Sequence, residues 1–206
     1  LACIDSGQMG SGEIVSVTLS DGAVKRFGGE GGPGRRMPSF NPGHEVHPPM
    51  WSPDSRQLFA LGAGELWRID LDTGVGHVVG SIQGQRIRAV VKPFDQPAIW
   101  SSDGGRTVWL MAQTLDGAYC TLHALDLKSG RTREVLREPK TCYGSYSLSA
   151  STATGELALV TTGSQQLPDI WLFNTREHRL RRATRLNGAL DRYALGESRI
   201  LRWKGP

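Results

Sequence analysis

Short apolar runs separated by turns rich in Gly, Pro and Asp recur along this chain about every fifty residues. One copy opens with Trp-Ser-Pro-Asp at 51–54 and continues with an apolar run at 58–61 and a second strand-like run at 66–70. A turn at 72–74 and a short run at 77–79 complete the copy. Short runs of Val, Leu, Ile and Trp bounded by turn residues predict β-strands rather than helices.

The same order of turns and strands returns twice. The second copy opens at Trp100 and the third, less regular one at Ala150. Half a copy comes first, with an apolar run at 14–19, a Ser-Asp-Gly turn and a second run at 24–27. A four-stranded unit repeated at this period is typical of a β-propeller blade. The predicted fold class is therefore all-β: a partial β-propeller of about three and a half four-stranded blades.

The repeat also predicts how the chain is divided. Residues 1–194 are expected to form the propeller segment, with blades at roughly 1–28 (partial), 46–80, 95–137 and 145–186. Residues 195–206 are expected to be a linker and the first strand of a further domain. The innermost strands are predicted at 46–51, 96–100 and 146–150, which places Trp51, Trp100 and Ala150 at equivalent positions. Because such a segment does not close into a ring, an open sheet edge is expected near 13–27.

The charge distribution bears on partners. The formal net charge is +4, and the cationic excess lies near the C-terminal end. Such a cluster suits an acidic partner or nucleic acid, but no stacking aromatics accompany it. We therefore expect solvated strand faces and a surface that docks onto a following domain, with no nucleic-acid partner. The cationic residues are Arg176, Arg179, Arg181, Arg182, Arg185, Arg192, Arg199, Arg202 and Lys204.

The cysteines and the hydropathy say little about location. Cys3, Cys120 and Cys142 lack the spacing of metal ligands. Cys120 and Cys142 could approach each other across neighbouring blades, so their pairing stays open, as does a cytoplasmic or periplasmic location. No apolar run is long enough to span a bilayer, and no membrane partner and no cofactor are expected.

No self-sufficient active site is predicted within these residues. The chain has no Gly-x-Ser-x-Gly elbow. His44 and His47 could hold a metal together on a helix, but the prolines at 42, 48 and 49 oppose a helix there, and no third ligand follows. The Gly-rich stretch 28–36 lacks the Lys-Ser/Thr ending of a phosphate-binding loop, which predicts a surface loop. No metal site is expected.

The stretch 168–205 carries the most particular motif. It reads Pro-Asp-Ile-Trp-Leu-Phe-Asn at 168–174, Leu-Arg-Arg-Ala-Thr-Arg-Leu-Asn at 180–187 and Leu-Gly-Glu-Ser at 195–198, and ends with Ile-Leu-Arg-Trp-Lys-Gly at 200–205. This stretch resembles the exit from the propeller into the α/β-hydrolase domain in serine peptidases of the prolyl oligopeptidase family. The Trp-Ser-Pro-Asp repeats are similar to that family's propeller, so the resemblance covers nearly the whole chain.

The resemblance implies a propeller that gates access to a Ser-Asp-His site in an α/β-hydrolase domain of the same polypeptide. The three catalytic residues would lie beyond Pro206, and Arg35 and Arg36 are candidates for holding the terminus of a peptide substrate. The activities it implies are those of acylaminoacyl-peptidases, dipeptidyl-peptidases or lasso-peptide isopeptidases, and the residues at hand do not separate them. The alternative is a non-catalytic TolB-like propeller that binds proteins.

Overall fold

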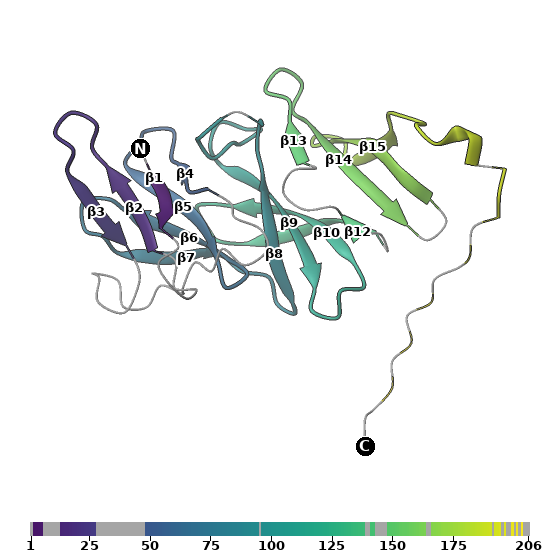
Figure 1. Ribbon diagram of the computed structural model, residues 1–206, viewed down its shortest axis with the longest axis horizontal. Coiled ribbons are helices and arrows are strands. Elements are labelled where there is room, and N and C mark those ends of the chain that lie inside the picture. Colours follow the sequence, from purple (N-terminus) through teal and green to yellow (C-terminus); the bar gives the residue numbers. More distant parts are fainter. Residues whose placement is uncertain are drawn as a thin grey trace.

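The structure, a computed structural model, describes residues 2–5, 13–27, 48–94, 96–138, 141–142, 148–163, 166–190 and 192–194, with single positions at 196, 199, 201 and 203. Four antiparallel sheets of three, four, four and five strands follow one another in chain order and lie side by side (Figure 1). The described part of the chain contains no α-helix and one short 3₁₀ helix, Gly188–Leu190. The predicted all-β, partial-propeller fold is confirmed.

The first sheet has the order β1 (Ala2–Asp5), β2 (Glu13–Val17), β3 (Val24–Phe27). β1 was not among the predicted strands. Ile14 and Phe27 are buried and pack against Leu58 of the next sheet, so this half blade already has an interface with its neighbour. Within the described residues β1 and β3 each pair only with β2. The open edge expected near 13–27 is thus β3, whereas β2 is paired on both sides.

The second sheet shows why these sequences form blades. Its order is β4 (Met50–Trp51), β5 (Gln57–Gly62), β6 (Glu65–Asp70), β7 (Gly76–Gly80). Along β5, Leu58 packs toward the first sheet while Phe59 packs toward the third. Successive side chains of a strand point to opposite faces. A blade covered on both faces therefore needs apolar residues at consecutive positions, as 58–61 has.

The third sheet corrects a prediction. Its order is β8 (Gln85–Val91), β9 (Thr107–Thr114), β10 (Cys120–Asp126), β11 (Thr132–Glu138). The innermost strand is β8, not the predicted 96–100. Proline has no N–H to give to a ladder, and Pro97 interrupts 96–100. In contrast, β8 buries Ile87 and Val90 against the second sheet and Ala89 and Val91 against the fourth.

Residues 96–100 instead extend the second sheet. Ala98 forms a parallel bridge with Trp51, whose N–H donates to the Pro97 carbonyl at 2.9 Å. The Trp51 carbonyl accepts from the N–H of Ile99 at 2.8 Å. The predicted equivalence of Trp100 with Trp51 is therefore wrong, because Trp100 lies outside any strand. Ala150 does match Trp51: each pairs with the second residue of the next strand, at Leu157 and Leu58.

The fourth sheet contains β12 (Thr141–Cys142), β13 (Leu148–Ala150), β14 (Glu156–Gly163), β15 (Gln166–Asn174) and β16 (Arg179–Arg182). β12 and β13 both pair with β14, so they share the innermost position. β13 lies within the predicted strand 146–150.

The core is divided among the three boundaries between neighbouring sheets. One apolar cluster fills each boundary, as expected for a repeat protein in which each unit contacts only its neighbours. The third cluster packs Trp109 and Leu122 against Leu157 and Phe173. At the edge of that third boundary the packing gives way to a polar groove.

Candidate functional site

An open groove of about 1150 Å³ lies between the third and fourth sheets. Four turns meet there: 101–106 before β9, 127–131 between β10 and β11, 151–155 before β14, and 175–178 between β15 and β16. Each turn occupies the same place in its own blade as a turn of the neighbouring blade. The repeat therefore brings polar turn residues of two blades to one place.

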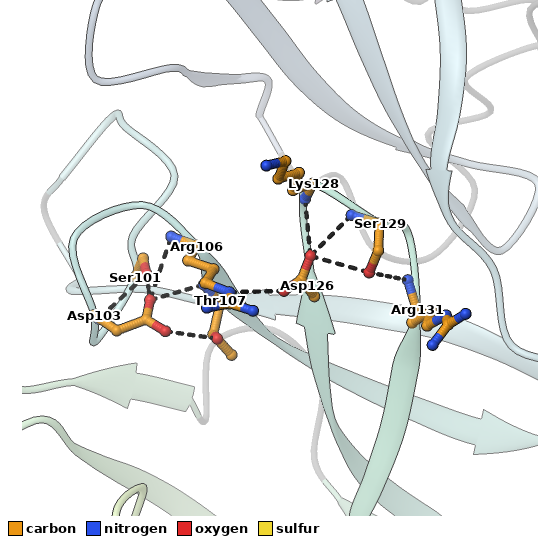
Figure 2. A network of polar contacts seen from close by, with 8 residues as sticks. All are labelled: Ser101, Asp103, Arg106, Thr107, Asp126, Lys128, Ser129 and Arg131. Atoms are coloured by element: carbon orange, nitrogen blue, oxygen red, sulfur yellow. Dashed lines mark hydrogen bonds and ion pairs between the residues drawn. The ribbon is translucent and has the colours of Figure 1, made fainter.

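The first turn is held by Asp103 (Figure 2). Its Oδ1 accepts from the Ser101 hydroxyl at 2.5 Å and from the Thr107 N–H at 2.8 Å, and its Oδ2 accepts from the Thr107 hydroxyl at 2.7 Å. Burial of the carboxyl acts to raise its pKa, but the hydrogen bonds from Ser101 and Thr107 outweigh burial, so the pKa of Asp103 is lowered. The carboxylate is thus ionised and directed at its own turn.

Asp126 holds the second turn in the same way. Its Oδ2 accepts from Arg106 Nε at 2.9 Å, and its Oδ1 accepts from the backbone N–H of Ser129 at 2.8 Å and of Lys128 at 3.1 Å. The hydrogen bond from Arg106, followed by those from Ser129, holds the pKa of Asp126 far below its ordinary value. Figure 2 shows the two turns joined through Arg106.

The wall of the groove is cationic. Lys128, Arg131 and Arg133 come from the β10–β11 hairpin, and Arg176 comes from the β15–β16 turn of the next sheet. With Arg106 they make five cationic side chains against the two carboxylates already described. Basic side chains thus outnumber acidic ones around this groove.

His178 stands at the junction of the two sheets. Its ring stacks on Phe173 with centroids 6.2 Å apart, meets Trp109 edge-on at 6.4 Å, and places Nε2 3.3 Å from Arg133 Nη2. Its backbone has φ of 53°, in the left-handed region that few non-glycine residues adopt. It takes the place that Gly130 has in the preceding blade. His178 follows Asn174 by four residues, as Gly130 follows Asp126.

A second polar cluster is closed to substrates. The Nε2 of His123 lies 3.0 Å from the Thr121 hydroxyl and 3.9 Å from a carboxylate oxygen of Glu134, and Thr121 in turn donates to Gln85. Thr121 and His123 are 2% and 3% exposed. Burial lowers the pKa of His123. This hydroxyl–imidazole pair therefore stabilises the interior of the third sheet and is not placed to attack a ligand.

Several candidates from the sequence lie outside the described residues, namely Arg35, Arg36, His44 and His47. Cys120 is buried in the cluster between the third and fourth sheets. The side chain of Cys142 is not among those described, so its pairing with Cys120 stays open. Among the described residues, no three His, Cys, Asp or Glu side chains gather as a metal site would require. No helix in the described ranges is long and apolar enough to cross a membrane.

The charge cluster predicted at 176–204 is divided by the structure. Arg181 pairs with Glu156 at 3.2 Å and Arg182 pairs with the buried Asp169, whereas Arg176 lines the groove. The groove itself was not predicted. The cationic residues Arg131 and Arg133 at the end of the β10–β11 turn could have indicated it, but their proximity to Arg176 and His178 depends on blade packing.

No protein-family model and no curated protein sequence matches the chain. Solved structures do match. An oligogalacturonate lyase in complex with manganese is 17% identical with a TM-score of 0.61 over 89% of this chain and 49% of that one. TolB from Acinetobacter baumannii is 14% identical with a TM-score of 0.57 over 90% and 41%. A puromycin hydrolase complexed with PGG is 18% identical with a TM-score of 0.57 over 95% and 28%.

These likenesses show the fold and not the activity, because the identities are low and the neighbours differ in function. The chain spans half or less of the length of each of these proteins. Prolyl-oligopeptidase-type peptidases and TolB-like proteins both occur among the neighbours, so the chain shares a β-propeller architecture with both groups.

Proposed function

We propose that this chain is the substrate-gating portion of a propeller in a serine peptidase of the prolyl oligopeptidase type, acting on peptide or isopeptide bonds. The observation that carries the proposal is the motif at 168–205, which resembles the exit toward an α/β-hydrolase domain. The fold likeness to a puromycin hydrolase over 95% of the chain is compatible with it.

The contacts of Asp169 support the assignment of that exit. This carboxylate, 1% exposed on β15, accepts from the Thr184 hydroxyl and the Leu186 N–H, both at 2.9 Å, and pairs with Arg182. One buried aspartate of the resembling motif thus fixes the chain on both sides of the point where it leaves the last sheet. A fixed departure point suits a propeller that must hold a following domain in register.

In the proposed enzyme the chemistry belongs to residues beyond Pro206. The serine would attack the scissile carbonyl, the histidine would transfer the proton to the leaving amine, and the aspartate would orient the histidine. The propeller would restrict which peptides reach that site. Arg35 and Arg36 are proposed to hold the charged terminus of the substrate, since guanidinium groups bind carboxylates bidentately.

The second candidate is a TolB-like binding module without catalysis. The specific observation that favours it is the cationic groove, which offers a protein partner a charged surface within the described residues themselves. The fold likeness to TolB over 90% of the chain is compatible with this function.

A fluorophosphonate probe separates the two candidates. The full-length parent polypeptide is treated with the probe, beside residues 1–206 alone and beside heat-denatured parent. We expect the folded parent to be labelled and the other two samples to stay unlabelled, because the probe reacts with an activated serine. A parent that is folded by circular dichroism and still unlabelled would contradict the peptidase proposal and favour the binding module.

A further inference from the structure

We propose that the groove between the third and fourth sheets binds an acidic polypeptide segment, through Arg131, Arg133 and Arg176. The inference concerns binding and does not depend on the proposed peptidase activity. Its first ground is the charge imbalance, with five cationic side chains facing two carboxylates. Its second ground is that most of those cationic side chains have no carboxylate partner among the described residues.

Both carboxylates of the groove are satisfied from within. Asp103 accepts from Ser101 and Thr107, and Asp126 accepts from Arg106 and from its own turn. Within the described ranges, Arg106 is the one groove cation with a carboxylate partner. The positive charge of the others is therefore available to a ligand.

His178 supplies an independent ground. The preceding blades have Gly74 and Gly130 at the corresponding turn position, with φ of 70° and 69°, where glycine is unstrained. This blade keeps a histidine there in the left-handed region, and the ring lies in the groove against Arg133. Backbone strain of this kind concentrates at ligand sites, where the side chain offsets its cost.

The backbone of the turns argues against a phosphate site of the loop type. Phosphate sites in loops rely on unoccupied backbone N–H groups. Here the amides of Lys128 and Ser129 donate to Asp126, and those at 176 and 177 donate to the Asn174 side chain. What remains for an anion is the cationic side chains, and the planar fork of a guanidinium group matches a carboxylate or a phosphate. The test therefore includes inorganic phosphate as a competing ligand.

The aromatic residues argue against single-stranded nucleic acid. Such ligands need exposed rings on which bases stack. Trp109 is 2% exposed and its ring packs against Phe173, while Trp100 is half-buried. Guanidinium groups spaced along a groove whose Trp109 and Phe173 rings are buried suit the glutamate and aspartate side chains of an extended peptide.

The test is fluorescence anisotropy of the full parent polypeptide with a fluorescein-labelled oligo-glutamate peptide in low-salt buffer. A matched lysine-rich peptide is the control ligand. The double variant R131E/R176E reverses two charges of the groove. The control R56E/R86E makes the same change in total charge at exposed arginines outside it. R131Q/R176Q repeats the test in case charge reversal disturbs folding, which circular dichroism checks.

We expect the groove variants to bind the acidic peptide about tenfold more weakly or worse, because they lose charges that contact the ligand. The control variant should stay within about twofold of wild type, because charges distant from the ligand change mainly the encounter rate. Equal losses in groove and control variants would show non-specific attraction and overturn the proposal. So would the absence of binding by the wild type, or tighter binding of a single-stranded oligonucleotide or inorganic phosphate than of the peptide.

Discussion

At the scale of single residues, the turns of successive blades are held by carboxylates at corresponding positions. Asp54 and Asp103 each accept from a serine hydroxyl two residues earlier, at 2.6 and 2.5 Å. Asp70 and Asp126 each accept from two backbone amides of the following turn. Because a side-chain oxygen replaces water at these amides, each carboxylate stabilises its own turn.

These carboxylates predict how stability depends on pH. Hydrogen bonds from Ser52, Thr73 and Arg106 lower the pKa values of Asp54, Asp70 and Asp126 in the folded protein. A folded-state pKa below the unfolded value gives stability that is present above the unfolded pKa, about 4, and is lost as the pH falls toward the folded pKa. Urea unfolding between neutral pH and about pH 3 should show this loss.

The variant D126N should lose less unfolding free energy than wild type as the pH falls, because the amide cannot titrate and cannot form the ion pair with Arg106. D72N, at the neighbouring hairpin of the preceding blade, is the matched control for removing one charge. If D126N and wild type lose stability in parallel below about pH 4, the contribution of Asp126 to acid sensitivity is refuted.

At the scale of elements, one four-residue spacing sets the hairpins between the third and fourth strands of each blade. The N–H of Gly74 donates to the Asp70 carbonyl at 2.9 Å, and that of Gly130 donates to the Asp126 carbonyl at 2.8 Å. Both glycines have φ near 70°. Glycine adopts this conformation without a steric cost, and a residue with Cβ does not.

The variant G130A should therefore be destabilised by about 1–2 kcal/mol relative to wild type. Space is not the cause, since the nearest atom to an added Cβ would be the Val79 carbonyl oxygen at 3.5 Å. G188A is the control, because Gly188 lies in the 3₁₀ helix and outside the left-handed region. Chemical denaturation of both variants measures the difference, and equal free energies of unfolding would contradict the backbone explanation.

The turn with histidine gives the complementary prediction. H178G should relieve backbone strain of about 1 kcal/mol and lose the ring contacts with Phe173 and Arg133. If the ring serves the groove, H178G keeps or gains stability while its affinity for the acidic peptide falls. A variant that is less stable and binds the peptide as wild type does would instead assign the ring a packing role.

At the scale of the whole molecule, stability comes from blade-to-blade packing. Leu125 of the third sheet is fully buried against the second sheet. A Cβ added at Gly80 of the second sheet would stand 2.9 Å from Leu125 Cδ2. The absence of a side chain at Gly80 thus lets the two sheets approach each other.

A double-mutant cycle tests that contact. L125A should cost about 2–5 kcal/mol by leaving a cavity, and G80A about 1–3 kcal/mol by overpacking. In the double variant the added methyl group enters space that Leu125 has left, so we expect it to be more stable than the sum of the single effects by at least about 0.5 kcal/mol. Strict additivity in equilibrium unfolding would mean that the sheets do not couple at this point.

The open architecture predicts the behaviour of residues 1–206 alone. β3 is a sheet edge, and the fourth sheet exposes Ile170. Unpaired edges and uncovered faces promote association between chains. Sedimentation velocity over a range of concentrations should show self-association, and a stable monomer at every concentration would count against the open propeller.

The sequence by itself determined the strands and turns that are specified by patterns a few residues long. Alternation, consecutive apolar pairs and the Asp-x-x-x-Gly spacing act over a few residues, so β5, β6, β9, β10, β14 and β15 and their turns could be predicted. The period of the repeat then determined that neighbouring units stack as blades. The tightly held carboxylates follow from the same turn chemistry.

Only the tertiary structure decided which segment competes successfully for an edge and which side chains meet across blades. Both 85–91 and 96–100 are strand-like. Residues 85–91 offer a full set of N–H groups and pair with β9. Residues 96–100 contain Pro97, which has no N–H, and they add to β4 instead. The groove of Arg131, Arg133, Arg176 and His178 joins residues up to 47 positions apart through blade packing. Local pattern carries no information about such distant contacts, because they are set by the packing angle and separation of whole sheets.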